Sequence, residues 1–483
     1  MKTEIETTET ITTAEMAVID LNCEYHGLSR LQLMENAGKA LAEEIRKRFD
    51  EGKITIFAGL GNNGGDAFVA ARHLSNFDIE VFLLGKTSEI KTDIAMRNFE
   101  VMRKAGIAVR EIRDSSNVEV CSCDIIIDAM LGTGVRGKLR QPYARVVETI
   151  NSSNAYVVAV DVPTGLNPDT GEYDTAVKAD LTVTFHKAKP GLLKAKEVVG
   201  ELVVRSIGIP PLFEMLTGPG DVRMVYRRQK EGHKGTHGRI LVVGGGPYTG
   251  APALAALAAY AAGADLVTLA VPKSVYKIVA SFSPDLIVRK LDGDEITLKN
   301  VEEIQKLVAR HHVVVMGMGT EEIKEVAEEV LKLKEVKKAV LDAGALLAEI
   351  PEGVECILTP HRGEFKKVFG FDPSSYDDVK KAAREAKAVV LLKAPEDVIS
   401  DGDRVRINRS GNAGMTVGGT GDTLAGVAGA FLVRGNALWA ASAAAFINGK
   451  AGDICFEKYG YNYRAMHVIE EIPTAIKEVL EFS

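Results

Sequence analysis

The chain has 483 residues, of which 46% are apolar and 26% charged, and it contains 46 glycines. This length exceeds what one hydrophobic core normally supports, so we expect two or more α/β domains rich in tight turns between strands and helices. The net charge of −7, with basic and acidic residues interspersed, excludes a positive stripe and argues against nucleic acid as the main partner.

The first 50 residues predict two helices, TAEMAVIDLNC and RLQLMENAGKALAEEIRKRF. The opening stretch MKTEIETTET is polar and acidic, unlike a signal peptide. The five cysteines of the chain match neither a disulfide framework nor a zinc site, which favours the reducing cytoplasm. We therefore expect a cytoplasmic protein.

Residues 54 to about 208 alternate short apolar runs with amphipathic segments. The runs are KITIFAG, IEVFLLG, CDIIIDAM, AYVVAVDV and DLTVTF. Strands that are apolar on both faces and separated by helices are typical of a parallel sheet covered on both sides. The pattern predicts a Rossmann-like parallel-sheet domain in the first half.

The stretch GLGNNGGDAF, residues 59–68, follows the first of these strands with the glycine spacing of a dinucleotide-binding fingerprint. We expect Asp66 at the start of the next helix, where a carboxylate would repel a bare pyrophosphate. Together with Asn62 and Asn63 it suits ribose hydroxyls, water or a monovalent cation. A glycine turn with a capping aspartate is the alternative.

Two further strand ends carry polar residues. DAMLGTGVRG contains Asp128 and a second glycine loop, residues 132–137, whose N–H groups and Arg136 suit phosphates. DVPTG contains Asp161 and Thr164. Because ligands of open α/β sheets bind beyond the carboxyl ends of the strands, we expect the three motifs to form one site. An aspartate that only caps the PTG turn is the alternative for Asp161.

NNGGD, DAMLGTGVRG and DVPTG together resemble the NAD(P)H-hydrate epimerases, over about residues 10–208 of a domain that we place at 1–213. That family interconverts the two C6 epimers of hydrated NADH or NADPH. The resemblance implies a potassium ion held by Asn63, Asp128 and Thr164, with Asp161 as the acid/base group. The family has glycine after NNGGD, where this chain has Ala67, and we expect a small effect. The implied hydrate contacts are Asn62, Asn63, Gly64, Gly65, Asp66, Gly132, Thr133, Gly134, Val135, Arg136, Gly137, Lys138, Tyr143 and Asp161.

Prolines, glycines and charges interrupt the pattern near residues 210–222, where we place a domain boundary. A second α/β series follows, with runs GRILVVGGG, ADLVTLAV, HHVVVMGMG, KKAVLDAG, ECILTPH, AVVLLK and DRVRINR. The long apolar stretch from Ala251 is interrupted by Gly263 and Asp265 and then becomes β-branched. This predicts a buried helix and a buried strand instead of a membrane span.

GNAGMTVGGTGDTLAG, residues 411–426, is a glycine-rich turn that feeds a helix beginning near Asp422. Converging N–H groups at a helix N-terminus form an anion hole suited to the charge that develops in phosphoryl transfer. The chain has no Walker-type motif. A simple N-cap is the alternative for Asp422.

This motif resembles the ribokinase-like superfamily, in which the aspartate deprotonates the hydroxyl that receives the phosphoryl group. With HKGTHGRILVVGGGPYTGAP, TPHRGEF and LLKAPED, the second half resembles the ADP- or ATP-dependent NAD(P)H-hydrate dehydratases, in a domain that we place at 222–483. That family phosphorylates the new hydroxyl of the hydrate and then eliminates phosphate, and it implies Mg²⁺ and ADP or ATP. The implied hydrate contacts are Ala251, Gly317, Gly319, His361, Arg362, Gly363, Glu364, Phe365, Lys366, Lys367 and Asp422. The implied nucleotide contacts are Lys393, Ala394, Pro395, Glu396, Asp397, Asn412, Ala413, Gly414, Met415, Thr416, Val417, Gly418, Gly419, Thr420 and Gly421.

Several of these residues have simpler interpretations. His361 could be a turn residue, Lys393 a solvated charge, and Gly317 and Gly319 parts of a strand-to-helix turn. The family's G-P-G turn is GMG here, and its H-P-G-E is HRGE, so that Met318 loosens one loop and Arg362 adds a positive charge.

The two resemblances predict a bifunctional enzyme that repairs hydrated NADH and NADPH, without a nucleic-acid or membrane partner and as a homo-oligomer. One alternative is a ribokinase-like kinase of a vitamin or sugar with an N-terminal ligand-binding regulatory domain. Another makes the first half a binding module without catalysis. The choices between ADP and ATP, and between hydrated NADH and NADPH, stay open.

Overall fold

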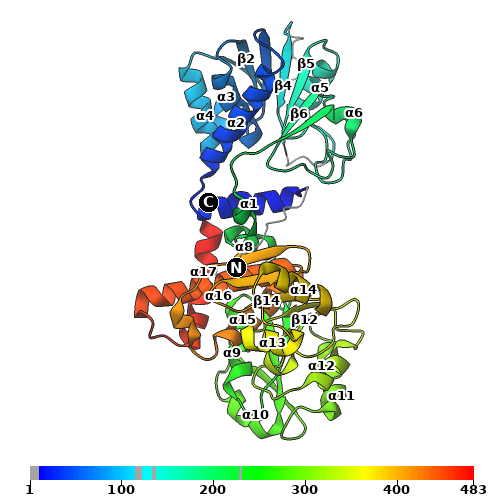
Figure 1. Ribbon diagram of the computed structural model, residues 1–483, viewed down its shortest axis with the longest axis vertical. Helices are drawn as coiled ribbons and strands as arrows, with labels where there is room; N and C mark the ends of the chain where they lie inside the picture. Colours follow the sequence, from blue (N-terminus) through cyan, green and yellow to red (C-terminus); the bar gives the residue numbers. More distant parts are fainter. Residues whose placement is uncertain (1–9, 115–121, 133–136, 227, 229–230, 483) are drawn as a thin grey trace. The chain divides into compact units, whose positions relative to one another are not determined.

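The computed structural model describes residues 10–114, 122–132, 137–226, 228 and 231–482. The chain separates into two compact units that meet in sequence at Glu214 and Met215, which we name the N-terminal unit and the C-terminal unit. Each has its own β-sheet with helices on both faces (Figure 1).

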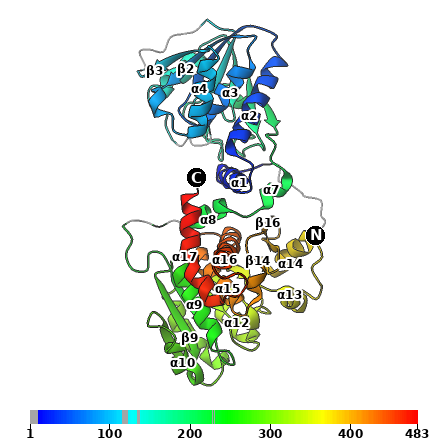
Figure 2. The same ribbon diagram turned by 90° about the vertical axis from the view of Figure 1, so that its left-hand side faces the viewer.

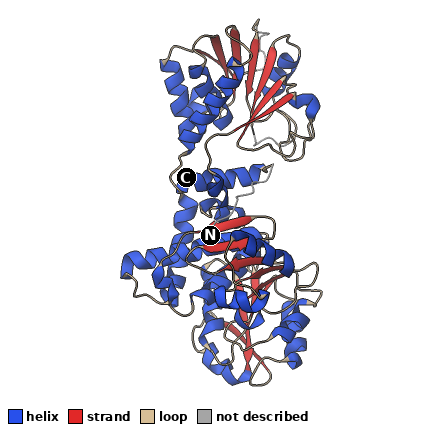
Figure 3. Cartoon of the chain, viewed as in Figure 1, coloured by secondary structure: helices blue, strands red, loops and turns tan. Residues whose placement is uncertain are grey.

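The sheet of the N-terminal unit is 7-stranded and parallel, in the order β3-β2-β1-β4-β5-β6-β7. Its strands run in red among blue helices in Figure 3. The strands are β1 Lys53–Ala58, β2 Asp78–Leu84, β3 Ala108–Ile112, β4 Ile125–Ala129, β5 Tyr156–Val160, β6 Leu181–Phe185 and β7 Glu201–Arg205. The helices are α1 Thr13–Tyr25, α2 Arg30–Arg46, α3 Asn62–His73, α4 Asp93–Lys104, α5 Tyr143–Asn151, α6 Lys196–Val199 and α7 Pro211–Met215.

Both faces of this sheet are buried, as the apolar runs predict. In β1, Ile54 and Ile56 pack into the core shared with α1 to α4, whereas Phe57 packs into the core shared with α5. The apolar runs of the sequence do not include β3 and β7, because these edge strands consist mainly of exposed and half-buried residues; Ile112 is the one buried residue of β3, and β7 has none. The strand order reverses between β1 and β4, and ligands of open α/β sheets bind at such a switch point.

The sheet of the C-terminal unit is 9-stranded, in the order β10-β9-β8-β11-β12-β13-β14-β15-β16. The pairs from β10 to β14 are parallel, while β15 pairs antiparallel with β14 and β16. The strands are β8 Arg239–Val243, β9 Leu266–Pro272, β10 Ile287–Leu291, β11 Val313–Met316, β12 Lys338–Leu341, β13 Glu355–Leu358, β14 Val389–Leu392, β15 Asp397–Ser400 and β16 Val405–Asn408. The helices are α8 Pro219–Val225, α9 Gly250–Ala261, α10 Lys273–Ala280, α11 Val301–Val308, α12 Lys324–Leu331, α13 Arg362–Phe369, α14 Tyr376–Ala386, α15 Thr420–Leu432, α16 Ala437–Tyr459 and α17 Ala465–Glu481.

The long apolar stretch forms helix α9 and strand β9, as predicted. Within the described residues, no helix combines the length and the apolar character that a membrane crossing needs. Helix α9 packs instead against α15 and α17, which lie close to it in Figure 2. The alanines and glycines of these helices allow that close approach, and they position the N-terminus of α15.

Gly426 shows how tight this packing is, because a Cβ built there would lie 2.0 Å from the backbone oxygen of Ala255 on α9. We expect Gly426→Ala to lower the free energy of unfolding by about 1–3 kcal/mol, since neither backbone can yield cheaply. The matched control is Gly250→Ala in α9, where a Cβ meets nothing within 4 Å. This substitution should stabilise the helix by up to about 1 kcal/mol. Thermal unfolding of the full chain compares them, and equal transitions would contradict the expectation.

Candidate active sites

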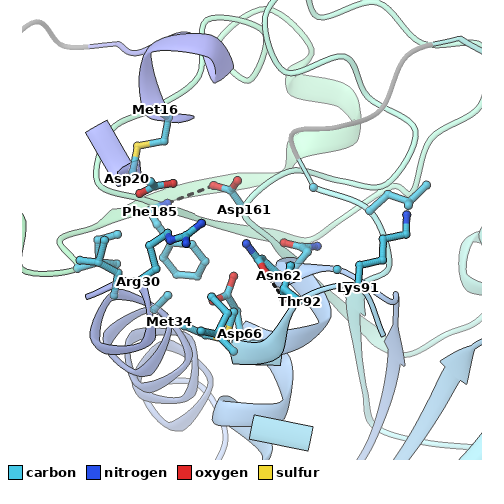
Figure 4. Close-up of a pocket in the computed structure, with 18 of the residues that line it drawn as sticks. Met16, Asp20, Arg30, Met34, Asn62, Asp66, Lys91, Thr92, Asp161 and Phe185 are labelled. Carbon is cyan, nitrogen blue, oxygen red and sulfur yellow. Dashed lines mark hydrogen bonds between the residues drawn. The ribbon is translucent and has the colours of Figure 1, made fainter. Parts of the chain in front are cut away.

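A cavity of about 420 Å³ lies at the carboxyl edge of the N-terminal sheet. Residues that follow β1, β4, β5 and β6 line it, together with side chains from helices α1, α2 and α5. Figure 4 shows Asp20 and Asp161 on one side of this cavity and Asp66 on the opposite side. The three motifs of the first half therefore do meet at one edge of the sheet.

Asp66 lies inside helix α3 and not at its start. The helix begins at Asn62, and its N-cap residue is Gly61, so no side chain caps it. Asp66 is thus in the second turn, so the expectation that it occupies the helix terminus was wrong, and it does not cap the turn. The register shifts because the two asparagines already have helical backbone. Burial raises the pKa of Asp66 well above its ordinary value, and the nearby carboxylates Asp161 and Asp20 add to this.

Asp161 has left-handed backbone geometry, with φ of 61°, directly after β5. Its Oδ1 accepts hydrogen bonds from Lys189 Nζ at 2.5 Å, Thr184 Oγ1 at 2.9 Å and the Phe185 N–H at 3.4 Å. Its Oδ2 accepts none from the residues that the structure describes, and Asp161 lines the cavity. Asp161 therefore does not cap the PTG turn, and one of its oxygens is available to a ligand. Backbone strain of this kind is concentrated at functional sites.

Asp128 caps the PTG turn instead. Its Oδ2 accepts from the Thr164 N–H at 2.8 Å and its Oδ1 from Thr164 Oγ1 at 2.7 Å. Asp128 is fully buried, and burial raises its pKa to about 6. Asn63 lies against the next loop, since a Cβ on Gly132 would be 3.2 Å from its Oδ1.

These three residues, expected as potassium ligands, are therefore neighbours. The Asn63 Nδ2 atom is buried without a hydrogen-bond partner among the described residues. A rotation of this amide by 180° would put an oxygen in that place. A carboxylate, a hydroxyl and an amide oxygen are suitable donors for a hard monovalent cation, so the donor set fits.

The remaining predicted contacts of the first half are distributed unevenly. Gly132 and Tyr143 line the cavity, whereas Lys138 is exposed and lies 3.8 Å from Asp174. Gly64 and Gly65 are buried in α3, and a Cβ on Gly65 would be 2.6 Å from Met34. Thr133, Gly134, Val135 and Arg136 lie outside the described residues.

Two residues of this site, Asp20 and Lys189, were not predicted from the sequence. Lys189 is only 1% exposed and follows β6, so the rule that placed Asp161 at a strand end could have found it. Asp20 comes from helix α1, where no local signal distinguishes it. Burial raises the pKa of Asp20 to about 7, against the opposing influence of Lys189.

In the C-terminal unit, Asp422 lies in the first turn of α15, behind the glycine turn. The N-cap is Gly419 with φ of 99°, and Asp422 makes no capping hydrogen bond, so the N-cap interpretation is not supported. Burial raises its pKa to about 7, and the carboxylate of Asp342 adds to this shift while Lys393 opposes it. The carboxyl group of Asp422 therefore changes its charge near neutral pH.

Lys393 links several of the predicted motifs at the end of β14. Its Nζ donates to Asp342 Oδ1 at 2.9 Å and lies 3.9 Å from Glu364 Oε2. A Cβ on Gly421 would be 3.3 Å from the same Nζ, so the ammonium borders the glycine turn. Burial alone would lower the pKa of Lys393, but Asp342 and Glu364 raise it. Lys393 is therefore a paired, charged residue of the site and not a solvated charge.

Asp342, in the C-terminal unit, was also not predicted from the sequence. It is 3% exposed, follows β12, and accepts from Thr359 Oγ1 at 2.9 Å as well as from Lys393. Its position directly after the run KKAVL was the available signal, because the same sheet edge carries Thr359 and Lys393.

The GMG turn, residues 317–319, is held by its neighbours. A Cβ on Gly317 would be 1.9 Å from the backbone oxygen of Asp342. A Cβ on Gly319 would be 2.3 Å from the backbone oxygen of Tyr248 and 3.1 Å from Ala251 Cβ. Met318 is fully buried, and its oxygen accepts from the Gly245 N–H at 2.9 Å. Packing thus replaces the rigidity that proline would give.

The segment from His361 to Lys367 forms the start of α13. The His361 Nδ1 accepts from the N–H groups of Gly363 and Glu364, so His361 is the N-cap of this helix. Arg362 is exposed and pairs with Asp372 through two hydrogen bonds, at 2.6 and 3.0 Å. Its charge therefore has a local partner. The other predicted contacts are Lys366 and Lys367, which are exposed, and Phe365, which is fully buried against Phe369 and Phe371.

The predicted nucleotide segments occupy turns around Lys393. Ala394 and Pro395 are exposed, Glu396 pairs with Arg409, and Asp397 begins β15 with its pKa raised to about 6 by burial. The Asn412 side chain caps a short turn by accepting from the Gly414 N–H at 3.0 Å. The rest of this loop comprises Ala413, Met415, Thr416, Val417, Gly418 and Thr420, of which Gly418 has open space beside it.

Comparison with known proteins assigns each unit to a family. Residues 30–191 match the family described as YjeF-related protein N-terminus, and residues 240–474 match the family described as NAD(P)H-hydrate dehydratase. A relative from Archaeoglobus fulgidus, named bifunctional NAD(P)H-hydrate repair enzyme Nnr, is 61% identical over 98% of this chain and 100% of its own length. One of the same name from Methanothermobacter thermautotrophicus is 44% identical over 96% of this chain and 94% of its length.

One solved structure is similar to part of this chain. It is described as the ADP/ATP-dependent NAD(P)H-hydrate dehydratase from Bacillus subtilis, co-crystallised with ATP and Mg²⁺. It is 23% identical, covers 55% of this chain and 96% of that one, and has a TM-score of 0.46.

Proposed function

The chain belongs to the family of the bifunctional NAD(P)H-hydrate repair enzymes, and from that premise we propose that its two units perform successive steps on hydrated NADH or NADPH. The N-terminal unit interconverts the two C6 epimers of the hydrate. The C-terminal unit dehydrates one epimer with ADP or ATP as phosphoryl donor. We also propose a cytoplasmic enzyme that forms a homo-oligomer, as the cysteine content and the family resemblance indicate.

In the N-terminal unit, Asp161 acts as the base. Its Oδ1 is held by Lys189 and Thr184, which leaves Oδ2 to accept the proton of the C6 hydroxyl. Asn63, Asp128 and Thr164 would hold a potassium ion, which supplies positive charge for the polar part of the substrate. The glycine loop after β4 takes the phosphates.

In the C-terminal unit, Asp422 takes the proton of the C6 hydroxyl while the hydroxyl oxygen attacks the terminal phosphorus of the donor. The bond between that phosphorus and its bridging oxygen breaks, and AMP leaves from ADP, or ADP from ATP. The N–H groups of the glycine turn and the Lys393 ammonium face the charge that develops on the phosphoryl group. Mg²⁺ bound to the nucleotide would neutralise its phosphates. The C6–O bond then breaks, phosphate leaves with the electron pair, and loss of a C5 proton forms the C5=C6 double bond.

The observation that carries the dehydratase assignment is the position of Asp422, which lies behind a glycine turn, beside Lys393 and with its pKa raised to about 7. The test uses the purified full chain and a mixture of both hydrate epimers. We expect both epimers to be consumed, with the absorbance of reduced nicotinamide recovered in proportion to the ADP or ATP supplied with Mg²⁺.

Other outcomes of this assay distinguish the alternatives. Stable phosphorylation of a vitamin or sugar alcohol, without recovery of reduced nicotinamide, would indicate a kinase. If reduced nicotinamide is recovered from one epimer, and the other epimer is consumed no faster than it epimerises spontaneously, the N-terminal unit is a binding module without catalysis.

A further inference from the structure

Lys189 cannot donate a hydrogen bond to every carboxylate around the epimerase cavity. A lysine ammonium has three N–H donors, and those of Lys189 are directed to Asp161 Oδ1 at 2.5 Å, Thr184 Oγ1 at 3.0 Å and the Phe185 oxygen at 3.2 Å. All three are therefore used. Any other carboxylate in the cavity feels the charge of Lys189 but receives no hydrogen bond from it.

Asp20 is such a carboxylate. It projects from α1 into the cavity, and it makes no hydrogen bond to any residue in the described part of the chain. Arg30, Asp66, Asp161 and Lys189 face it, from α2, from α3 and from the loops after β5 and β6. Burial raises the pKa of Asp20 to about 7, so at and below neutral pH much of it carries a proton. That O–H group has no acceptor among the described residues and is available to a ligand.

We propose that Asp20 is a second catalytic residue of the epimerase, which donates a proton to the ring nitrogen N1 of the hydrate while Asp161 removes the proton of the C6 hydroxyl. This inference rests on the proposed epimerase function. The hydroxyl oxygen and N1 are both bonded to C6, so an acid and a base that act on them must stand side by side. Asp20 and Asp161 do stand together, on the same side of the cavity (Figure 4).

The step balances without a further reagent. Asp161 Oδ2 takes the hydroxyl proton, the oxygen forms a C=O double bond, the C6–N1 bond breaks, and its electron pair takes the proton of Asp20. Rotation about the C5–C6 bond then presents the other face of the carbonyl. N1 attacks it and returns its proton to Asp20, while the oxygen recovers its proton from Asp161. The product is the other epimer, and both carboxyl groups regain their original states.

The test is Asp20→Asn, in the full chain and without nucleotide, so that only epimerisation is followed by chromatographic separation of the epimers. We expect the rate above the spontaneous background to fall by about 100-fold or more, because a general acid is lost. The wild-type kcat/KM should decrease above pH about 7, as Asp20 loses its proton. In the variant this alkaline decrease should disappear.

The matched control is Asp78→Asn, at an exposed position that begins β2, which should leave the rate and its pH profile unchanged. An Asp20→Asn rate within about threefold of wild type would overturn the proposal. So would a slow variant that keeps the alkaline decrease, since Asp20 would then not be the titrating acid. If the wild type itself shows no acceleration, the proposed epimerase function fails. If the variant dehydrates the reactive epimer at the wild-type rate and has the wild-type thermal transition, it is folded.

Discussion

Asp422→Asn is expected to lower the dehydratase kcat/KM by about 10²–10⁴-fold, the contribution typical of a general base. Asparagine keeps the shape of the side chain at the start of α15 but cannot take the hydroxyl proton. The rate of epimerisation should stay unchanged, because Asp422 lies in the C-terminal unit. Recovery of reduced nicotinamide from the reactive epimer, with saturating ADP or ATP, measures the loss.

The pH dependence separates this role from a structural one. Asp422 must be ionised to act as a base, and burial raises its pKa to about 7, so the wild-type kcat/KM should rise with pH and level off above about 7. The residual activity of Asp422→Asn should lack this rise. Asp403→Asn is the control, since that side chain is 89% exposed and its one contact among the described residues is a surface ion pair with Arg384. A variant that keeps both the rate and the profile would exclude Asp422 as the base.

The two sites could be located from the sequence because both lie at carboxyl ends of parallel strands. Each strand that leads into them is a buried apolar run, and the residue after it is visible without a structure. Asp128 and Asp161 were predicted in this way, whereas Lys393 was implied by the resemblance of LLKAPED to the dehydratases, and the structure places all three at the ends of strands. Asp342 and Lys189 follow the same rule and were missed because no motif drew attention to them.

The remaining features depend on contacts between distant segments. Asp20 belongs to a helix that reaches the cavity from outside the strand pattern, so only the assembled unit shows what it faces. The charge of Arg362 is paired by Asp372, whose position depends on the loop after α13. Asp66 differs from its predicted place because the capping geometry, and not the glycine spacing, decides where α3 begins. The edge strands β3 and β7 lack the two-sided apolar pattern, since they cover only part of the core.

Asp161→Asn should reduce epimerisation by about 10²–10⁴-fold, because the base is removed. It should also destabilise the N-terminal unit, since Lys189 is 1% exposed and would lose its counter-charge. Breaking a buried ion pair by removing one partner costs about 3–5 kcal/mol. A loss of activity by this variant alone could therefore reflect unfolding, so thermal unfolding of the full chain must be measured beside the rate.

The double variant Asp161→Asn/Lys189→Met separates the two effects. Methionine fills the space of the lysine stem without a charge, and replacing both partners of a buried pair is often close to neutral for stability. We expect the double variant to regain most of the lost stability but none of the epimerase rate. If the rate returned together with the stability, Asp161 would be a structural residue that only holds Lys189. If the rate stayed low in a stable protein, the free Oδ2 of Asp161 would be required for the chemistry itself.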